Sequence, residues 1–380
     1  MALHTLWFLL DLVFWAGFFV LEGFDFGVGV LHSFVGRSDG ERRQALNTVG
    51  PFWDGNEVWL IVAGAVIFAA FPAWYATMFS SLYLALVVIL LALIIRGVSF
   101  EFRGKLDDPT WRGAFRWTMT IGSALIPLLL GTGLGDLLHG LPFDAAHNYT
   151  GTFWDLLTPY GLYTGVTMLV LSLLAGAMFL AVKTTGPVAV RSNATARALG
   201  PVATLVVIGF VIWTREVSGQ GVVPTPTAIL AIIAVAASAW LATTDRLGWA
   251  FAATAVAIVT TVTSLFEALY PNVMVSSTDH AFNLTVSNAS SNSYSLRVMT
   301  VVAVIFTPFV LAYTAWNYWV FRKRVGAPPQ PDPAEGTDGG SGSGSAAAGA
   351  VGSVDETTAA DTAADTAAAV VDGASGAAKP

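Results

Sequence analysis

Long apolar runs recur along most of this chain, and they restrict its fold more than any other feature. An α-helix needs about 20 residues to cross the hydrocarbon core of a bilayer. Nine runs come close to or exceed that length: about 5–31, 56–71, 76–97, 115–137, 160–183, 199–217, 226–244, 247–269 and 297–321. Within a bilayer the backbone polar groups must bond to one another, which favours helices. The sequence therefore predicts an all-α polytopic membrane protein with about nine transmembrane helices.

The composition agrees with this class and excludes several others. The chain is 55% hydrophobic and only 11% charged, far from the average of soluble proteins. It contains no cysteine, which excludes disulfides, thiolate catalysis and iron–sulfur clusters. The net charge of −7 arises in residues 326–380, which hold eight acidic residues and one lysine. The remaining 17 acidic and 17 basic residues balance, so the body gives no charge argument for a nucleic-acid partner.

The composition changes abruptly at Gly326. The residues beyond it are mainly Ala, Gly, Ser, Thr, Pro and Asp, with no aromatic residue and no Leu, Ile or Met. Such a segment cannot bury a hydrophobic core. We expect a transmembrane helical domain over 1–325 and a disordered acidic tail over 326–380.

Basic residues alternate between the two sides of the expected helices. Nearly all Lys and Arg lie in the loops 32–55, 98–114, 184–198 and 245–246, and in the segment 322–324 after the last helix. Loops rich in Lys and Arg stay in the cytoplasm, so the N-terminus is predicted outside and the tail inside. The start of the chain lacks the basic region of a cleaved signal peptide, and we expect the first helix to be retained.

Histidines lie only at the ends of the expected helices or in loops: His4, His32, His139, His147 and His280. A membrane-embedded heme usually takes an axial imidazole from within a span. Heme held by this chain is therefore not expected, and no spacing of residues suggests a metal site.

Acidic residues inside the apolar runs are the strongest functional signal. Glu22 and Asp25 are neighbours at i, i+3 on the first helix, and Asp54 begins the second helix from the same side. Acids at membrane depth usually face a protein interior or a water-filled path. We interpret Glu22, Asp25 and Asp54 as a converging set that forms a proton entry path. Gly23 and Gly27 lie between the first two acids, as a small face that lets another helix approach.

Structural interpretations of two of these acids remain open. Asp54-Gly-Asn-Glu57 fits a capping box, in which Asp54 only closes the first turn of a helix. Asp25 is close enough to the interface to cap a helix or to pair with Arg37. Glu22 lies deeper and has no comparable alternative.

Other polar and aromatic residues near helix ends have simple expected roles. Arg96 is expected to snorkel to the membrane surface. Asp11 and Glu267 are expected at the outer interface, while Trp53 and Trp59 are expected to serve packing.

The stretch from Gly23 into the second expected helix resembles a known family. Gly23-Phe-Asp-Phe-Gly27, Arg42-Arg43, Asn47 and Pro51-Phe-Trp-Asp-Gly-Asn-Glu-Val-Trp-Leu60 resemble subunit II of the cytochrome bd quinol oxidases. Agreement continues through Phe71-Pro-Ala-Trp-Tyr-Ala76, Arg96, Phe100-Glu-Phe-Arg-Gly-Lys105, Thr158-Pro-Tyr-Gly-Leu162 and Tyr313-Thr-Ala-Trp-Asn-Tyr318. The resemblance runs from the first expected helix to the ninth and omits only the tail.

This resemblance implies a fold of two four-helix bundles plus a peripheral helix. It also implies a bacterial inner-membrane complex that oxidises quinol and reduces dioxygen to water. In the family, hemes b and d and the quinol-oxidation loop belong to the partner, subunit I. Some relatives hold a structural quinone in subunit II, and the family leaves room for a small single-helix accessory subunit.

The resemblance also implies roles for individual residues. Asp25 and Asp54 match acidic positions of the family's cytoplasmic proton path, and Glu22 matches a position where relatives carry an acid. The supporting motif residues are Gly23, Gly27, Trp53, Asn56, Glu57, Trp59 and Arg96.

Two other functions use the same acids. A proton-coupled secondary transporter would need them for coupling, but transporters tend to show inverted repeats and broken midplane helices. No convincing internal repeat is visible in this sequence. A structural scaffold subunit would use the acids only to cap helices.

Overall fold

Nine helices that are long and apolar enough to cross a membrane account for most of the described chain. A computed structural model describes residues 2–221 and 223–326. Within these residues the spans are α1 with α2 (Leu3–Leu21 and Gly23–Val35), α4 (Trp53–Ala70), α6 (Tyr83–Phe102), α7 (Pro109–His139), α8 (Pro159–Lys183), α9 (Gly186–Val217), α10 (Pro226–Thr243), α11 (Leu247–Leu269) and α12 (Ser293–Val320). The predicted all-α fold with nine spans is confirmed. The expected tail, apart from Gly326, lies outside the described residues.

Short elements complete the fold: α3 (Asp39–Asn47), α5 (Pro72–Ser81), the 3₁₀ helices η1 (Phe153–Leu156) and η2 (His280–Phe282), and the strands β1 (Asn272–Met274) and β2 (Leu284–Thr285). The strands pair antiparallel with Asn272 opposite Thr285. Before α3, the Ser38 hydroxyl accepts from the Glu41 N–H, and the Glu41 carboxylate accepts from the Ser38 N–H. This reciprocal capping box fixes where α3 begins.

Predicted helix boundaries differ most from the structure at two places. The third apolar run, expected at 76–97, is divided, because Pro72 opens the separate helix α5 and α6 begins at Tyr83. The predicted loop 184–198 is helical, since α9 already begins at Gly186 with a proline in its first turn. Hydropathy identifies only the part of a helix that lies in the hydrocarbon core. Polar turns at the ends of a long helix are therefore predicted as loops.

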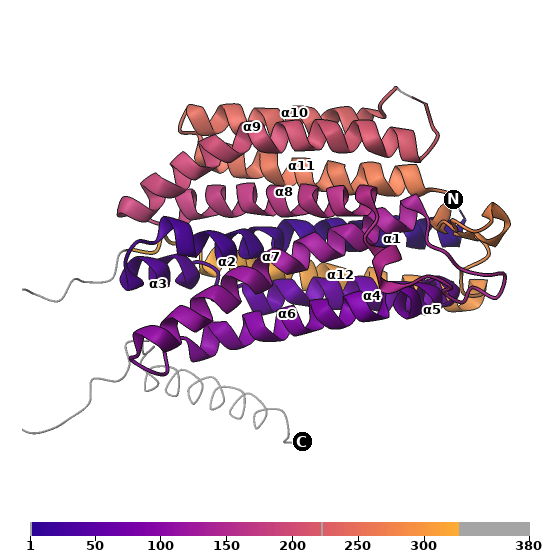
Figure 1. Cartoon of the computed structure of the whole chain (residues 1–380), viewed down its shortest axis with the longest axis horizontal. Coiled ribbons are helices and arrows are strands. Elements are labelled where there is room, and N and C mark those ends of the chain that lie inside the picture. The colour runs from indigo at the N-terminus through magenta and orange to yellow at the C-terminus, as the bar shows by residue number, and fades with distance from the viewer. Residues whose placement is uncertain (1, 222, 327–380) are drawn as a thin grey trace, which may run out of the picture. The chain divides into compact units, whose positions relative to one another are not determined.

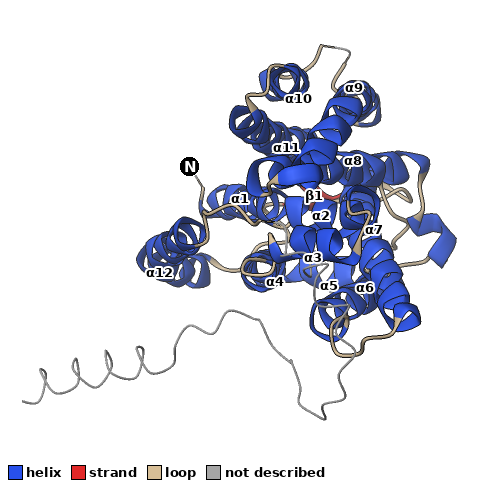
Figure 2. Ribbon diagram, turned by 90° about the vertical axis from the view of Figure 1, so that its left-hand side faces the viewer, coloured by secondary structure: helices blue, strands red, loops and turns tan. Residues whose placement is uncertain are grey.

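The spans form two groups of four with one helix at the edge. The first group contains the continuous pair α1–α2 with α4, α6 and α7, and the second contains α8, α9, α10 and α11. Helices α2 and α7 both pack against α8, and α1 packs against α11, so the two groups are joined along several helices. Helix α12 lies at the margin beside α1 and α4 (Figure 2), and Leu296 is its one buried residue. The expected two bundles plus a peripheral helix are confirmed.

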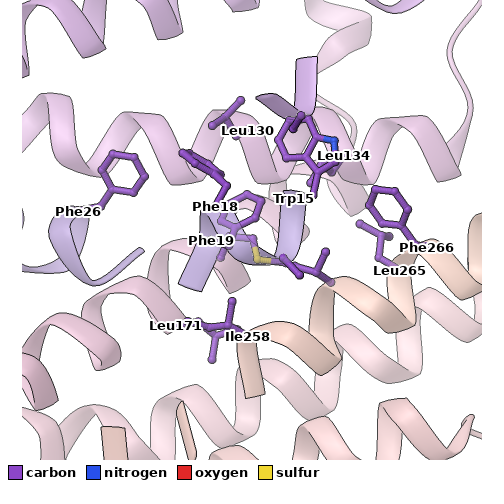
Figure 3. Packing of buried hydrophobic residues seen from close by; sticks show 14 of the residues in the cluster. Trp15, Phe18, Phe19, Phe26, Leu130, Leu134, Leu171, Ile258, Leu265 and Phe266 are labelled. Atoms are coloured by element: carbon purple, nitrogen blue, oxygen red, sulfur yellow. The ribbon is translucent and has the colours of Figure 1, made fainter. Parts of the chain in front are cut away.

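Aromatic side chains fill the contact between α1–α2 and its neighbours. Trp15, Phe18 and Phe19 of α1 and Phe26 of α2 are buried and point toward α7 and α11 (Figure 3). The ring centroids of Phe18 and Phe19 are 5.2 Å apart, and those of Phe18 and Phe26 are 6.0 Å apart. Edge-to-face aromatic pairs at such distances stabilise a core beyond their buried area.

The closest helix approach occurs between α2 and α8. A Cβ atom placed on Gly27 would lie 2.9 Å from the Cα of Gly176, and it would also overlap the carbonyl oxygen of Ser172. Gly23 faces the same helix, with the Ser172 hydroxyl 3.4 Å from the corresponding position. The prediction that these glycines let a helix approach closely is confirmed at Gly27, whereas a Cβ at Gly23 would make only an ordinary van der Waals contact.

Gly27→Val is therefore expected to lower the yield and thermal stability of the folded chain sharply, because backbone atoms of α8 cannot move aside cheaply. Gly248→Val is the matched control, since that glycine also lies in a helix but no heavy atom lies within 4 Å of its Cβ position. Unfolding temperatures in detergent measure the difference. Equal losses for the two variants would contradict the close-packing argument.

The loops with basic residues gather at one end of the bundles. Gln44 of α3 donates to the carbonyl oxygens of Thr185 and Val325, at 3.1 and 2.9 Å. These contacts join α3, the start of α9 and the segment after α12 (left end of Figure 1). At the opposite end, the Leu141 N–H donates to the Val275 carbonyl at 3.1 Å. The loop 270–296 is thus ordered by packing within the chain.

Candidate functional site

A buried cluster of acids around one arginine lies where α1 meets α2. Glu22 joins the two helices with nearly helical backbone angles. Its N–H donates to the Phe18 carbonyl at 2.8 Å, and its carbonyl accepts from the Phe26 N–H at 3.0 Å, so the helical ladder continues through it. Glu22 and Asp25 therefore stay on one face, and both side chains are fully buried.

Arg96 supplies the positive charge of this cluster. It is fully buried, and its Nη1 lies 2.7 Å from Glu22 Oε1 and 3.6 Å from Glu57 Oε2. Its N–H bonds are not aligned on these oxygens, so the contacts are ion pairs rather than hydrogen bonds. The predicted snorkelling of Arg96 was wrong. The side chain points inward from α6 because it pairs with Glu22 and Glu57 of the neighbouring helices.

Aromatic rings surround the guanidinium of Arg96. Its central carbon lies 4.9 Å from the ring centre of Phe26, 5.4 Å from Phe100 and 5.9 Å from Trp53. The rings of Trp53 and Phe100 stack on each other, with centroids 4.9 Å apart. A weakly hydrated guanidinium on aromatic faces loses less on burial than an ammonium would, which suits arginine to this position.

Asn56 connects Asp25 to the peripheral helix. Its amide nitrogen donates to Asp25 Oδ2 at 2.8 Å and to the Leu21 carbonyl at 2.9 Å. Its amide oxygen accepts from the Tyr318 hydroxyl at 2.9 Å. Asp25 therefore takes part in a bonded series across α2, α4 and α12, and the suggested pairing with Arg37 is not formed.

Asp54 and Glu57 lie outside this series, along a groove between α4 and α6. The groove has a volume of about 330 Å³, and its lining is apolar apart from these two carboxylates and the Trp53 indole. Asp54 is exposed, whereas the Glu57 side chain is 22% exposed and reaches Arg96. The three predicted acids do not all converge: Glu57 rather than Asp54 completes the buried cluster.

The capping-box interpretation of Asp54 was also wrong. Helix α4 begins at Trp53, so Phe52 is the N-cap residue and no side chain caps the helix. The helix starts two residues earlier than the box requires, since Phe52 and Trp53 already donate to the Val49 carbonyl in the preceding turn. The Asp54 carboxylate is left without a hydrogen-bond role in the fold.

Trp59 and Asp11 illustrate one correct and one incorrect prediction. Trp59 packs against Gly17 and against the ring of Phe14, with centroids 6.1 Å apart. Asp11, expected at the interface, is fully buried, and neither of its oxygens has a hydrogen-bond partner. The helical period explains this result, because Asp11 shares the buried face of α1 with Trp15 and Phe18. Glu267 is exposed and accepts from the Thr227 hydroxyl.

Sequence reasoning gave Glu57 only a supporting role, and it missed Tyr318 and, away from the site, Asp136. The role of Glu57 was detectable, because Asp54 and Glu57 at i, i+3 place a second acid one turn deeper in α4. Nothing in the sequence paired Tyr318 with Asn56, which lies 262 positions away. Asp136 is buried near the far end of α7, where it accepts from Thr158 at 2.5 Å. In the part of the chain that the structure describes, no group of three or more His, Asp or Glu side chains is arranged to hold a metal ion.

The nine apolar spans of the described residues define an integral membrane protein, and the carboxylates and the arginine inside them mark its candidate site. The family model described as cytochrome bd terminal oxidase subunit II matches residues 3–321. The chain therefore belongs to the subunit II family of the cytochrome bd terminal oxidases, and it is a subunit of an oxidoreductase.

Individual relatives support the same assignment. The chain is 42% identical over 328 residues to cytochrome bd ubiquinol oxidase subunit 2 of Bacillus subtilis (strain 168), covering 85% of this chain and 97% of that protein. It is 36% identical over 362 residues to cytochrome bd-I ubiquinol oxidase subunit 2 of Escherichia coli (strain K12), covering 85% and 95%. The solved structure of the bd oxidase from Geobacillus thermodenitrificans matches with a TM-score of 0.68 at 17% identity, over 85% of this chain and 100% of that one. This last likeness concerns the fold alone.

Proposed function

We propose that this chain is the subunit without heme of a bacterial plasma-membrane complex that oxidises quinol and reduces dioxygen to water. Family membership carries the proposal, together with the names of the relatives from Bacillus subtilis and Escherichia coli, which are ubiquinol oxidase subunits. The heme-bearing subunit I is the expected partner, and this chain stabilises it through the exposed apolar faces of its helices.

The histidines favour placing the hemes in the partner. All five lie in the described residues, and His32 alone is buried. The two ring nitrogens of His32 are already occupied, because Nδ1 lies 2.7 Å from the Gly29 carbonyl and Nε2 lies 3.4 Å from the Ser33 hydroxyl. An axial heme ligand needs one free ring nitrogen directed into a large cavity. These residues do not fit a heme, and no step is assigned to one in this chain.

We also propose that the acids form a proton path. The order of exposure gives its direction: Asp54 is exposed on the groove, Glu57 is 22% exposed, and Glu22 and Asp25 are fully buried. Asp54 takes up a proton, Glu57 passes it inward, and Asp25 holds it at the inner end. Arg96 pairs with Glu22, and Asn56 with Tyr318 orients the Asp25 carboxylate.

The position of the cluster supports uptake from the cytoplasm. Asn56 and Glu57 lie in the first turns of α4, and Tyr318 lies in the last turn of α12. Both helix ends belong to the end of the bundles where the basic loops gather. Basic loops stay in the cytoplasm, so we place this end inside, the N-terminus outside and the C-terminus inside.

Co-expression with and without the partner tests the oxidase assignment. Membranes with both subunits should take up oxygen when quinol is supplied, and membranes with either subunit alone should not. The chain purified alone should show no b- or d-type heme absorbance. A stoichiometric heme band in the isolated chain, or full oxygen uptake by the partner alone, would contradict the proposal. The rival transporter function predicts proton-coupled solute uptake by the chain alone.

A further inference from the structure

A pocket rich in arginine lies apart from the acid cluster, at the end where the basic loops gather. Its volume is about 250 Å³. Its walls come from α3, from the residue after α6 and from the first turns of α7, which lie together at this end of the first bundle (Figure 2). The lining residues are Asp39, Arg42, Arg103, Pro109, Arg112, Gly113 and Arg116. Four guanidinium groups thus face one carboxylate.

That single carboxylate is already shared. Asp39 accepts from Arg103, and it lies 3.7 Å from Arg112 Nη1 and 3.8 Å from Nη2 of Arg43, which approaches from outside the pocket. One negative charge divided among three arginines leaves the pocket strongly positive. An anion that enters it therefore gains from all four lining arginines.

Of the other acids near the pocket, one contacts a lining arginine from outside and two are engaged elsewhere. Asp107 contacts Arg112 from the solvent side at 2.6 Å, and its own side chain is 91% exposed. Asp108 caps α7 by accepting from the Trp111 N–H at 2.8 Å. Glu41 pairs with Arg191 at 2.7 Å, a contact that lowers the pKa of its carboxyl. None of the three lines the pocket.

Buried donors in the pocket lack acceptors. The Nε atoms of Arg42, Arg103 and Arg116 are shielded from solvent and have no hydrogen-bond partner. Arg103 is 7% exposed. Burial lowers its pKa, the charges of Arg43 and Arg112 act in the same direction, and Asp39 opposes them. Buried donors without acceptors cost free energy, so these arginines favour an anion that accepts their hydrogen bonds.

An apolar strip continues from the pocket along α7. Gly113, Trp117 and Ile121 follow one another at i, i+4, and the last two side chains are 50% and 53% exposed. The guanidinium of Arg116 lies 5.5 Å from the Trp117 ring centre, at the boundary between the two surfaces. An arginine pocket beside an exposed apolar strip matches a molecule with a phosphate and a long hydrocarbon chain.

We propose that this pocket binds the phosphate of an anionic phospholipid headgroup, with an acyl chain lying along Trp117 and Ile121. Arginine binds phosphate with two parallel N–H donors, which explains why the lining uses arginine throughout rather than lysine. The charge surplus selects an anionic headgroup over a zwitterionic one, because a choline would be repelled. The ligand has no part in the proton path.

Native mass spectrometry of the intact, delipidated complex tests the proposal. Short-chain phosphatidylglycerol, phosphatidylcholine and inorganic phosphate are titrated separately onto the wild type and onto Arg42→Gln with Arg116→Gln. The control is Arg246→Gln, an exposed arginine immediately before α11 at the same end. Each lost charged hydrogen bond weakens binding by about tenfold or more.

One phosphatidylglycerol per complex is expected, with binding at least about tenfold weaker in the double variant and unchanged in Arg246→Gln. If the double variant fails to assemble, Arg116→Gln alone is measured in the same way. Unchanged phosphatidylglycerol binding in an assembled variant, or equal binding of phosphatidylcholine, would overturn the proposal. Inorganic phosphate that binds as tightly as the lipid would show a free-anion site and would overturn the lipid assignment.

Discussion

Arg96→Met is expected to prevent assembly of the complex or to leave it severely unstable. The substitution removes the positive charge 2.7 Å from Glu22 while that carboxylate stays fully buried. Breaking one side of a buried ion pair costs about 3–5 kcal/mol, because the remaining charge has neither water nor a partner. Methionine has a similar length and can occupy the space among Phe26, Phe100 and Trp53, so lost charge rather than lost volume should dominate. Yield of the heme-containing complex and its unfolding temperature measure the effect.

A second substitution separates charge from shape. Glu22→Gln combined with Arg96→Met removes both charges of the closest buried ion pair, and such replacements are often nearly neutral. The double variant should therefore recover much of the lost yield. Arg197→Met is the control, since it breaks an ion pair with Asp245 whose side chains are 42% and 72% exposed. Exposed pairs contribute about 0–1 kcal/mol. Normal stability of Arg96→Met alone would show that the buried pair does not hold the bundle together.

The sequence was most informative where a single physical rule determines the structure. Helix number follows from the length of apolar runs, and α11 spans Leu247–Leu269 as predicted because lipid contact and helix length coincide there. The start of α9 was missed since its first turns leave the apolar region and carry polar residues. Hydropathy alone does not predict the part of a helix that continues beyond the membrane into water.

The candidate site was partly predictable for a related reason. Acidic side chains within an apolar run cost free energy in a membrane, and Glu22 and Asp25 were identified as candidate site residues on that basis. Their partners depend on packing between helices distant in sequence. Arg96 looked like an interfacial residue near a helix end, and only the approach of α6 to α1 and α4 reveals that it pairs inward. Tyr318 reaches Asn56 for the same reason.

Asp25→Asn is expected to leave the assembled complex with normal hemes but to slow the proton-dependent phase of oxygen reduction by about a hundredfold, within the range that positioned acid–base groups contribute. An amide has nearly the shape of the carboxylate and can still accept from Asn56, yet it cannot gain and lose a proton. Rapid mixing of the reduced complex with oxygen resolves this phase. Heme spectra recorded on the same samples confirm assembly.

Asp11→Asn is the matched control for this experiment. Asp11 is equally buried on the same continuous pair of helices, and it has no hydrogen-bond contact with the acid cluster. The substitution should leave the proton-dependent phase unchanged. A slowdown equal to that of Asp25→Asn would mean that loss of any buried carboxylate disturbs the complex, and the relay would lose its support.

Asp54→Asn completes the argument because Asp54 is the exposed end of the proposed path. Since Phe52 rather than Asp54 caps α4, the substitution removes the acid without removing a helix cap. Glu57 also lines the groove and is 22% exposed, so it is not reached through Asp54 alone, and the slowdown should be smaller than for Asp25→Asn. The double variant Asp25→Asn with Asp54→Asn should be at least as slow as Asp25→Asn. Full activity of the double variant would favour a scaffold in which the acids serve only the fold.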